Sequence, residues 1–446
     1  MERLLLEGLL RWKNSKRRKP LVLRGLRRVG KTWILKEFGR RYYKNTAYFN
    51  FAEKKSCGEF FECAEDADRV LQNLMLAGGQ KILPEKTLVI FDEVQEKPEV
   101  LRSMKLFQEQ VPQYHLVCTG FPLGSEGDLA SVQYLDFLQL TPMNFTEFLM
   151  AGGDGELAEY LKTIHTFEPV PEKLFDPLLE KLKMYYVTGG MPEPVLWWTQ
   201  ERDMEAMQES LSQILYACER DFARVPDAKE FSKVSAIWSS IPVQLAGENK
   251  KFNYQTVKRG ARKREYEDAL QWLSDTGLAT KVYRNASPAL PFPAGDDPSA
   301  FKLYPADVGM LRRLCLLSPT AFGEGDRLFT EFQGALSECC ILEALAGRFR
   351  ESPRYWSRNN PFYEVDFILQ YGNERIPVEV RAERNAKASG LKKYREVFHT
   401  QTRLGVCFSL DNLKLETGLL RLPFFLADEA DRLIGMALNQ GTGNES

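Results

Sequence analysis

Four residues near the start of the chain have the types and the spacing of a phosphate-binding loop. Gly25, Gly30, Lys31 and Thr32 fit the pattern G-x-x-x-x-G-K-[ST]. In such a loop the glycines let backbone N–H groups turn toward phosphates, the lysine reaches the outer phosphates and the hydroxyl holds Mg²⁺. The pattern therefore predicts a site for ATP and Mg²⁺. Its residues are Gly25, Leu26, Arg27, Arg28, Val29, Gly30, Lys31 and Thr32.

Two acidic residues later in the chain complete this chemistry. The apolar run at residues 87–91 leads directly into Asp92 and Glu93, as a buried strand does when it ends at a magnesium site. We expect Asp92 to hold the Mg²⁺ together with Thr32, and Glu93 to polarise the attacking water. A third apolar run ends at Thr119, whose hydroxyl would either sense the γ-phosphate or merely close a strand. The catalytic candidates are thus Glu93, Lys31 and Thr119.

A second set of acidic residues lies in the last third of the chain. Glu338 stands in an apolar stretch at helical spacing, and Asp366 and Glu379 stand in two apolar runs that flank a Gly-Asn turn. This order, with Arg381 two residues after the last acid, resembles the restriction-endonuclease-like fold, whose acids bind Mg²⁺. That fold has lysine in the last position, and a guanidinium cannot give up a proton to act as a base. We therefore expect a vestigial nuclease site without cleavage; the other interpretation is that these acids close the edge of a hairpin.

Five basic residues lie at the start of a predicted helix in the middle of the chain and just before it. Residues 253–284 read as helix, short glycine turn, helix and strand, which is the order of a helix-turn-helix with a wing. Tyr266, Leu270 and Leu273 would face the core and leave the basic end exposed. Such an end can contact DNA, but winged helices serve protein contacts as often, so double-stranded DNA and a protein are alternative partners. The basic residues are Lys258, Arg259, Arg262, Lys263 and Arg264.

The composition indicates the class of protein. A chain of 446 residues with 44% hydrophobic and 27% charged residues is expected to fold into several globular domains. Its 60 Lys and Arg nearly balance its 61 Asp and Glu, so a polyanion must be met by a local basic patch. The sequence shows no CxxC pair, no secretory leader and no apolar stretch of membrane-spanning length. These features predict a cytoplasmic protein without a membrane contact.

The elements that must position these residues follow from hydrophobic periodicity. Residues 21–24 form a short apolar run before the phosphate loop, and apolar residues at helical spacing follow the loop. Strand, loop and helix are the setting that a phosphate-binding loop requires. From about residue 155 the periodicity is helical without strand alternation. This segment is either a lid that closes on the nucleotide or a rigid packing subdomain.

Several motifs together resemble one known family. Besides the phosphate loop they are FDEVQ at residues 91–95, CTG at 118–120, LQLTPMNFTEFL at 138–149, TGGMPEPV at 188–195 and KLYPADVGMLRRL at 302–314. They look like the AAA+-type ATP-binding proteins of bacteria and archaea that carry a C-terminal domain of unknown function. Two positions depart from that family. Phe121 replaces its usual serine, and the arginine that usually precedes the 138–149 segment has no counterpart here.

The resemblance implies a multidomain α/β protein. Its parts would be a P-loop NTPase parallel sheet (residues 1–150), a helical lid (151–230), a winged helix (231–320), a small α/β restriction-endonuclease-like domain (321–435) and a disordered tail (436–446). The implied activity is hydrolysis of ATP to ADP and phosphate by an AAA+ molecular switch whose C-terminal half contacts DNA or a protein. An ATP-regulated DNA nuclease and a nucleotide-gated protein-interaction module without DNA are the alternative interpretations.

Overall fold

The chain forms two compact units. The computed structural model describes residues 2–53, 55–62, 64–121, 132–225, 228–287, 290–320, 325–349, 351–359, 362–385 and 387–440. The first unit comprises Glu2–Thr141 and Asp275–Leu278, and the second comprises Pro142–Ser274 and Ala279–Ser446. No helix within these described stretches is both long and apolar enough to cross a membrane.

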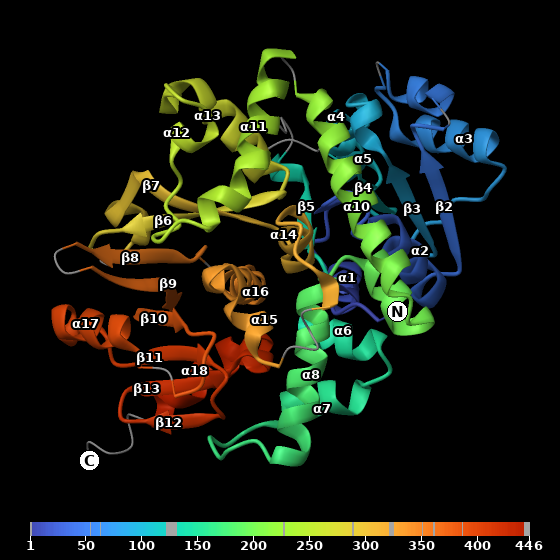
Figure 1. Ribbon diagram of the computed structural model, residues 1–446. Coiled ribbons are helices and arrows are strands. Elements are labelled where there is room, and N and C mark those ends of the chain that lie inside the picture. Colours follow the sequence, from blue (N-terminus) through green and yellow to red (C-terminus); the bar gives the residue numbers. More distant parts are fainter. Residues whose placement is uncertain are drawn as a thin grey trace. The chain divides into compact units, whose positions relative to one another are not determined.

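The first unit is built on a parallel five-stranded sheet with the strand order β2-β3-β4-β1-β5. β3 (Thr87–Asp92) and β4 (His115–Thr119) are buried at every position, as is usual for parallel strands whose two faces are covered. Figure 1 shows β2, β3 and β4 side by side. The other strands are β1 (Leu21–Gly25), β2 (Asn45–Asn50) and β5 (Asp136–Leu140). The helices are α1 (Leu5–Asn14), α2 (Lys31–Tyr42), α3 (Ala67–Gly78), α4 (Glu99–Arg102) and α5 (Met104–Gln110).

Aromatic side chains form much of the core on one side of β3. Phe61 meets Phe91 of β3 edge to face, with ring centroids 5.4 Å apart, and Phe49 of β2 lies 6.1 Å from the same ring. These residues are at most 2% exposed and belong to one hydrophobic cluster. This packing holds the strand that ends at Asp92 in a rigid position.

The second unit begins with helices. First come α6 (Phe145–Ala151), α7 (Gly155–Thr163), α8 (Glu172–Thr188), α9 (Pro192–Leu196) and α10 (Met204–Asp221). Then follow α11 (Ala228–Leu245), α12 (Tyr254–Val257), α13 (Lys263–Asp275) and the hairpin of β6 (Ala279–Asn285) and β7 (Asp296–Pro305). The predicted order of helix, turn, helix and strand is therefore present.

The hairpin of β6 and β7 forms one edge of an eight-stranded mixed sheet with the order β12-β13-β11-β10-β9-β8-β6-β7. Tyr371 pairs with Glu374 across the Gly-Asn turn, so β9 and β10 form the predicted hairpin. The other strands are β8 (Arg354–Arg358), β9 (Tyr363–Tyr371), β10 (Glu374–Val380), β11 (Gly405–Ser409), β12 (Lys414–Glu416) and β13 (Leu419–Pro423). The remaining helices are α14 (Val308–Leu314), α15 (Arg327–Thr330), α16 (Ala335–Leu345), α17 (Ser389–Val397) and α18 (Ala430–Gln440). The predicted class, a multidomain α/β protein with a parallel sheet, is confirmed, and the structure shows in addition that the second unit contains one mixed sheet.

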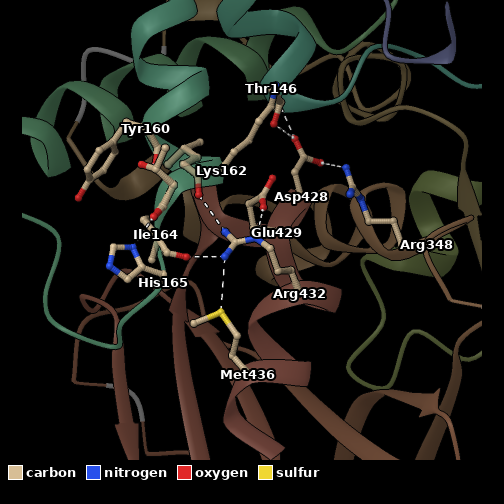
Figure 2. Close-up of polar contacts among 12 residues, drawn as sticks. Thr146, Tyr160, Lys162, Ile164, His165, Arg348, Asp428, Glu429, Arg432 and Met436 are labelled. Carbon is tan, nitrogen blue, oxygen red and sulfur yellow. Dashed lines mark hydrogen bonds and ion pairs between the residues drawn. The ribbon is translucent and has the colours of Figure 1, made fainter. Parts of the chain in front are cut away.

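Polar contacts tie the first helices of the second unit to its C-terminal end, as Figure 2 shows. The backbone N and the Oγ1 of Thr146 on α6 each lie 2.8 Å from Oδ2 of Asp428. The guanidinium of Arg432 on α18 donates to the carbonyl oxygen of Leu161 on α7 at 3.1 Å. Both α6 and α7 are therefore bound to the C-terminal segment of the same unit.

Three segments with recognisable motifs meet inside the second unit. The backbone N of Met143 donates to the carbonyl oxygen of Gly190 at 2.6 Å, and the N of Gly190 donates to Oδ2 of Asp307 at 2.5 Å. A Cβ on Gly190 would lie 2.0 Å from the carbonyl oxygen of Met143, so only glycine fits there. Burial raises the pKa of Asp307 to about 6. The motifs at residues 138–149, 188–195 and 302–314 thus build a structural junction.

The structure differs from the sequence-based expectations at two places. It places α6 in the second unit, whereas the sequence predicts that the first domain extends to residue 150. The prediction of a disordered tail is wrong for residues 436–440, because α18 continues to Gln440 with buried apolar residues at helical spacing; residues 441–446 lie outside the described residues.

Candidate functional site

The predicted phosphate loop lies between the end of β1 and the start of α2. Gly25 has φ 151° and Gly30 has φ 99°, which are backbone conformations that L side chains disfavour. A Cβ on Gly25 would also lie 2.3 Å from the carbonyl oxygen of Leu140. Gly30 is the N-cap of α2, and the N-terminus of a helix is where backbone N–H groups can bind an anion. The structure thus supplies the strand, loop and helix that the motif requires.

Lys31 is the first residue of α2, and its side chain folds back onto the loop. Its Nζ donates hydrogen bonds to the carbonyl oxygens of Gly25, at 2.9 Å, and Leu26, at 2.8 Å. The ring centroid of Phe121 lies 5.7 Å from the same Nζ. A phosphate oxygen can displace these carbonyl partners, because a hydrogen bond between two charged groups is stronger than one to a neutral carbonyl.

The carboxylate of Asp92 is the meeting point of three hydrogen bonds. Its Oδ2 accepts from the hydroxyl of Thr32 at 2.7 Å and from the hydroxyl of Tyr48 at 2.8 Å, and its Oδ1 accepts from the backbone N of Glu93 at 2.9 Å. Burial and the contact with Asp92 raise the pKa of Tyr48, so this hydroxyl keeps its proton as a donor. A hydroxyl and a carboxylate are oxygen ligands of the kind that Mg²⁺ prefers. The pair of Thr32 and Asp92 therefore fits a magnesium ion.

Glu93 follows Asp92 directly and adopts a left-handed backbone conformation with φ 56°. One of its carboxylate oxygens, Oε2, accepts a hydrogen bond from Nε2 of Gln95. Oε1 of Gln95 in turn accepts from the backbone N of Phe121 at 3.1 Å. Glu93 is only partly buried, so water can reach it as the predicted role requires.

Thr119 lies at the end of β4, between β3, which ends at Asp92, and β1, which leads into the phosphate loop. Its hydroxyl is fully buried and donates to the carbonyl oxygen of Leu23 on β1 at 3.0 Å. This bond links two neighbouring strands, in agreement with the simpler interpretation of Thr119 as the end of a strand. A sensor role for this hydroxyl stays a prediction.

Tyr48 and Gln95 are site residues that the sequence-based reasoning does not include. Tyr48 reaches Asp92 because β2 pairs with β3 in parallel, with Asn50 opposite Asp92. No local pattern around Tyr48 indicates that pairing. For Gln95 a signal exists, since it belongs to the FDEVQ motif, but its partner Phe121 is revealed only by the fold.

The acidic residues predicted as a vestigial nuclease site make contacts that are typical of structural residues. Glu379 is fully buried and accepts hydrogen bonds from the backbone N of Leu391, at 2.9 Å, and from Arg381. Asp366 accepts from the backbone N of Val380 at 2.8 Å. Within the described stretches of the chain, no group of three or more His, Cys, Asp or Glu is placed to hold a metal ion.

Lysine ammonium groups lie beside the other buried acids of this region. Glu338 binds Lys250, and Nζ of the fully buried Lys302 lies 3.6 Å from Glu338 and 2.6 Å from Glu364. Burial alone would raise the pKa of Glu338, but Lys250 and Lys302 outweigh it and lower that pKa to about 2. Burial and Glu338 together raise the pKa of Asp366 to about 7. Two ammonium groups thus supply the positive charge that a metal would supply, and these residues do not fit a metal ion.

The five basic residues predicted to contact DNA are all exposed at the start of α13 and just before it. Tyr266, Leu270 and Leu273 are buried on the opposite side of the helix, as predicted. Nζ of Lys263 lies 3.3 Å from the carbonyl oxygen of Pro298 and 4.0 Å from Oε1 of Glu267. The exposed residues are Lys258, Arg259, Arg262, Lys263 and Arg264.

Comparison with protein families matches three regions of the chain. Residues 17–149 match a family described as an AAA domain. Residues 179–321 match a domain of unknown function (DUF8612), and residues 333–425 match another domain of unknown function (DUF4143). No curated protein matches the chain.

Solved structures show only distant similarity. A Walker-type ATPase of Pyrococcus abyssi is 16% identical, covers 70% of this chain and 95% of its own, and has a TM-score of 0.42. The Orc1 protein of Aeropyrum pernix in complex with DNA is 14% identical, with coverages of 70% and 90% and a TM-score of 0.26. RuvB of Thermotoga maritima is 12% identical, with coverages of 63% and 86% and a TM-score of 0.28. These scores establish nothing about what this chain does. Residues 17–149 thus match the AAA domain family and contain the strand, phosphate loop and helix of a P-loop fold.

Proposed function

We propose that this protein is a Mg²⁺-dependent ATPase of the AAA+ type that acts as a molecular switch. One arrangement supports the proposal: the hydroxyl of Thr32 lies 2.7 Å from the carboxylate of Asp92, beside a loop that also holds the ammonium of Lys31. Glu93, the next residue after Asp92, is the acid available to a water molecule. These are the groups that phosphoryl transfer to water requires.

Each residue has a defined task in this proposal. The N–H groups of the loop and of the start of α2 bind phosphate oxygens, and Lys31 binds the outermost ones. Thr32 and Asp92 hold Mg²⁺, which when bound offsets charge on the phosphates. Glu93 orients the attacking water and accepts its proton.

The decisive experiment is a steady-state ATPase assay with measured ATP affinity. We expect Lys31→Ala to abolish tight ATP binding. Glu93→Gln should keep ATP binding and lower kcat by about 10²- to 10⁴-fold, which is the usual contribution of a general base. Glu109→Gln on α5 is the matched control, because the side chain of Glu109 is 52% exposed and pairs with Lys105 on the surface at 3.9 Å. If Glu93→Gln turned over ATP at the wild-type rate, the role of Glu93 as the water-activating residue would be wrong.

A second function, binding of double-stranded DNA, is favoured by the five exposed cations around the start of α13. Exposed Arg and Lys at the beginning of such a helix suit contacts with DNA phosphates. The test compares DNA binding at several salt concentrations for wild type and for the triple variant Arg262→Ala, Lys263→Ala and Arg264→Ala. Each lost phosphate contact should reduce the slope of log affinity against log salt by about one. An absence of salt-dependent binding by wild type would favour a protein partner instead.

A further inference from the structure

Gln95 connects the candidate water-activating acid to the end of β4. Its Nε2 donates to Oε2 of Glu93, and its Oε1 accepts from the backbone N of Phe121 at 3.1 Å. The side chain is partly buried, so these two bonds are partly shielded from water. The side-chain amide of Gln95 therefore links the segment that follows β3 to the segment that follows β4, and these two strands are neighbours in the sheet.

The two contacts determine how the carboxamide of Gln95 is oriented. A backbone N–H can only donate, so the carbonyl oxygen of the side chain must face Phe121. The NH₂ group must then face Glu93, which is the arrangement that a carboxylate needs because it can only accept. The orientation satisfies both partners at once, and a flipped amide would satisfy neither.

Glu93 is consequently held from two sides. Its backbone N is bound to Oδ1 of Asp92 at 2.9 Å, and Oε2 of its side chain is bound to Gln95. The other carboxylate oxygen, Oε1, has no hydrogen bond within the described part of the chain, so it is the oxygen left for water. Phe121, the far partner of Gln95, also lies against Nζ of Lys31, with 5.7 Å from Nζ to the ring centroid.

We propose that Gln95 is a positioning residue that sets the place of the Glu93 carboxylate relative to Lys31 and the phosphates. The inference rests on the proposed ATPase function and extends it. Gln95 itself transfers no proton and touches no phosphate. It acts through Glu93, and misplacing a reacting group by about 1 Å can cost roughly 10²-fold in rate.

The test uses the full-length protein and two variants of similar side-chain volume. Gln95→Met removes both hydrogen bonds, whereas Gln95→Glu can still accept from Phe121 but places a second negative charge beside Glu93. Both should lower kcat by roughly 10- to 100-fold, with the affinity for ATP changed by less than about 3-fold. In Gln95→Glu the acid limb of the pH–rate profile should also move to higher pH by about one unit, because neighbouring carboxylates resist ionising together. Gln113→Glu is the control, since Gln113 is exposed in the same unit.

The outcomes separate the inference from the function on which it rests. Wild-type kcat and an unshifted pH profile in Gln95→Glu, with Glu93→Gln still impaired, would overturn the positioning role and leave the ATPase proposal intact. Full activity of Glu93→Gln would overturn the proposed role of Glu93, and the role of Gln95 with it. If Gln95→Met does not fold, the kcat and the pH profile of Gln95→Glu decide the question alone.

Discussion

The hydroxyl of Thr32 donates a hydrogen bond to the carboxylate of Asp92 over 2.7 Å, although 60 residues separate them in the chain. Thr32 lies in the first turn of α2 and Asp92 is the last residue of β3. The parallel sheet brings the two together, because its strands all end at the same edge. Two residues at the ends of different elements thus place a hydroxyl and a carboxylate side by side.

Thr32→Val tests whether this pair holds Mg²⁺. Valine has nearly the shape of threonine but lacks the hydroxyl ligand, so Mg²⁺ should no longer strengthen ATP binding. We expect the affinity gained on adding Mg²⁺ to fall by about 10- to 100-fold, with the affinity in EDTA unchanged. Titration calorimetry with and without Mg²⁺ measures both values. Thr163→Val at the exposed end of α7 is the control; an unaltered response to Mg²⁺ in Thr32→Val would show that Thr32 is no ligand.

Tyr48→Phe tests the neighbour that orients Asp92. The hydroxyl of Tyr48 donates to Oδ2 of Asp92, the oxygen that also accepts from Thr32. Nζ of Lys36 lies 3.8 Å from the centroid of the Tyr48 ring. Removing the hydroxyl keeps this ring contact but releases one lone pair of Asp92. The Mg²⁺ concentration needed for half-maximal activity should rise by about 10-fold, as is usual when a group behind a metal ligand is lost. The control is Tyr216→Phe on α10, where the side chain is exposed; it should leave the Mg²⁺ concentration for half-maximal activity unchanged.

Some parts of the fold and of the candidate site could be predicted from local sequence patterns, whereas others depend on contacts between distant segments. The loop around Lys31 follows from consecutive residues, because glycine positions and helical spacing are local properties. Tyr48 could not be found in this way, since only the pairing of β2 with β3 brings it to Asp92. The acids Glu338 and Asp366 are recognisable as a group, but the burial of Lys302 among them depends on the fold, which brings Glu338 of α16 and Glu364 of β9 to the side chain of a residue on β7. Charge neutralisation by that lysine is a property of the folded core that no spacing reveals.

His115 should make the stability of the first unit depend on pH. Burial, with Arg18 and Lys13 nearby, lowers the pKa of His115 to about 4, and Nδ1 of its ring contacts the hydroxyl of Tyr43 at 2.6 Å. In the unfolded chain the ring titrates near 6.5. Between these values the unfolded chain binds a proton that the folded chain does not, so the stability present above about pH 6.5 is lost as pH falls toward 4.

The matched variant is His115→Gln, which can still accept from Tyr43 but does not titrate. Between pH 7.5 and pH 4.5, wild type should lose roughly 2 kcal/mol more unfolding free energy than this variant. Urea unfolding at several pH values measures the difference. His399→Gln in an exposed turn should follow wild type, and parallel curves for His115→Gln and wild type would contradict the prediction.

Lys302→Met should be strongly destabilising. Burial alone would lower the pKa of Lys302, but Glu338, Glu364 and Asp366 together raise it above its ordinary value. Removing the ammonium leaves buried carboxylates without their counter-charge, at a cost of about 3–5 kcal/mol. Lys414→Met provides the contrast, because Lys414 pairs with Glu416 at 2.9 Å while its side chain is 63% exposed. That surface pair should contribute no more than about 1 kcal/mol.

A double variant shows whether the loss in Lys302→Met comes from charge. Adding Glu364→Gln removes the carboxylate that lies 2.6 Å from Nζ of Lys302, so part of the lost stability should return. Chemical unfolding of the two single variants and the double variant gives the coupling free energy. If the two changes were additive, Lys302 would stabilise this region by packing rather than by its charge.

Thr146→Val tests whether α6 is held by the C-terminal segment or moves independently of it. Oδ2 of Asp428 accepts two hydrogen bonds from Thr146, and its Oδ1 lies 3.6 Å from Arg348. The substitution removes one bond to a buried carboxylate, which should cost about 1.5–3 kcal/mol. Because this bond joins α6 to Asp428, hydrogen exchange should become faster in α6 and around Asp428 together. Thr163→Val on α7 should change neither region, and faster exchange in α6 alone would mean that the helix moves independently of the C-terminal segment.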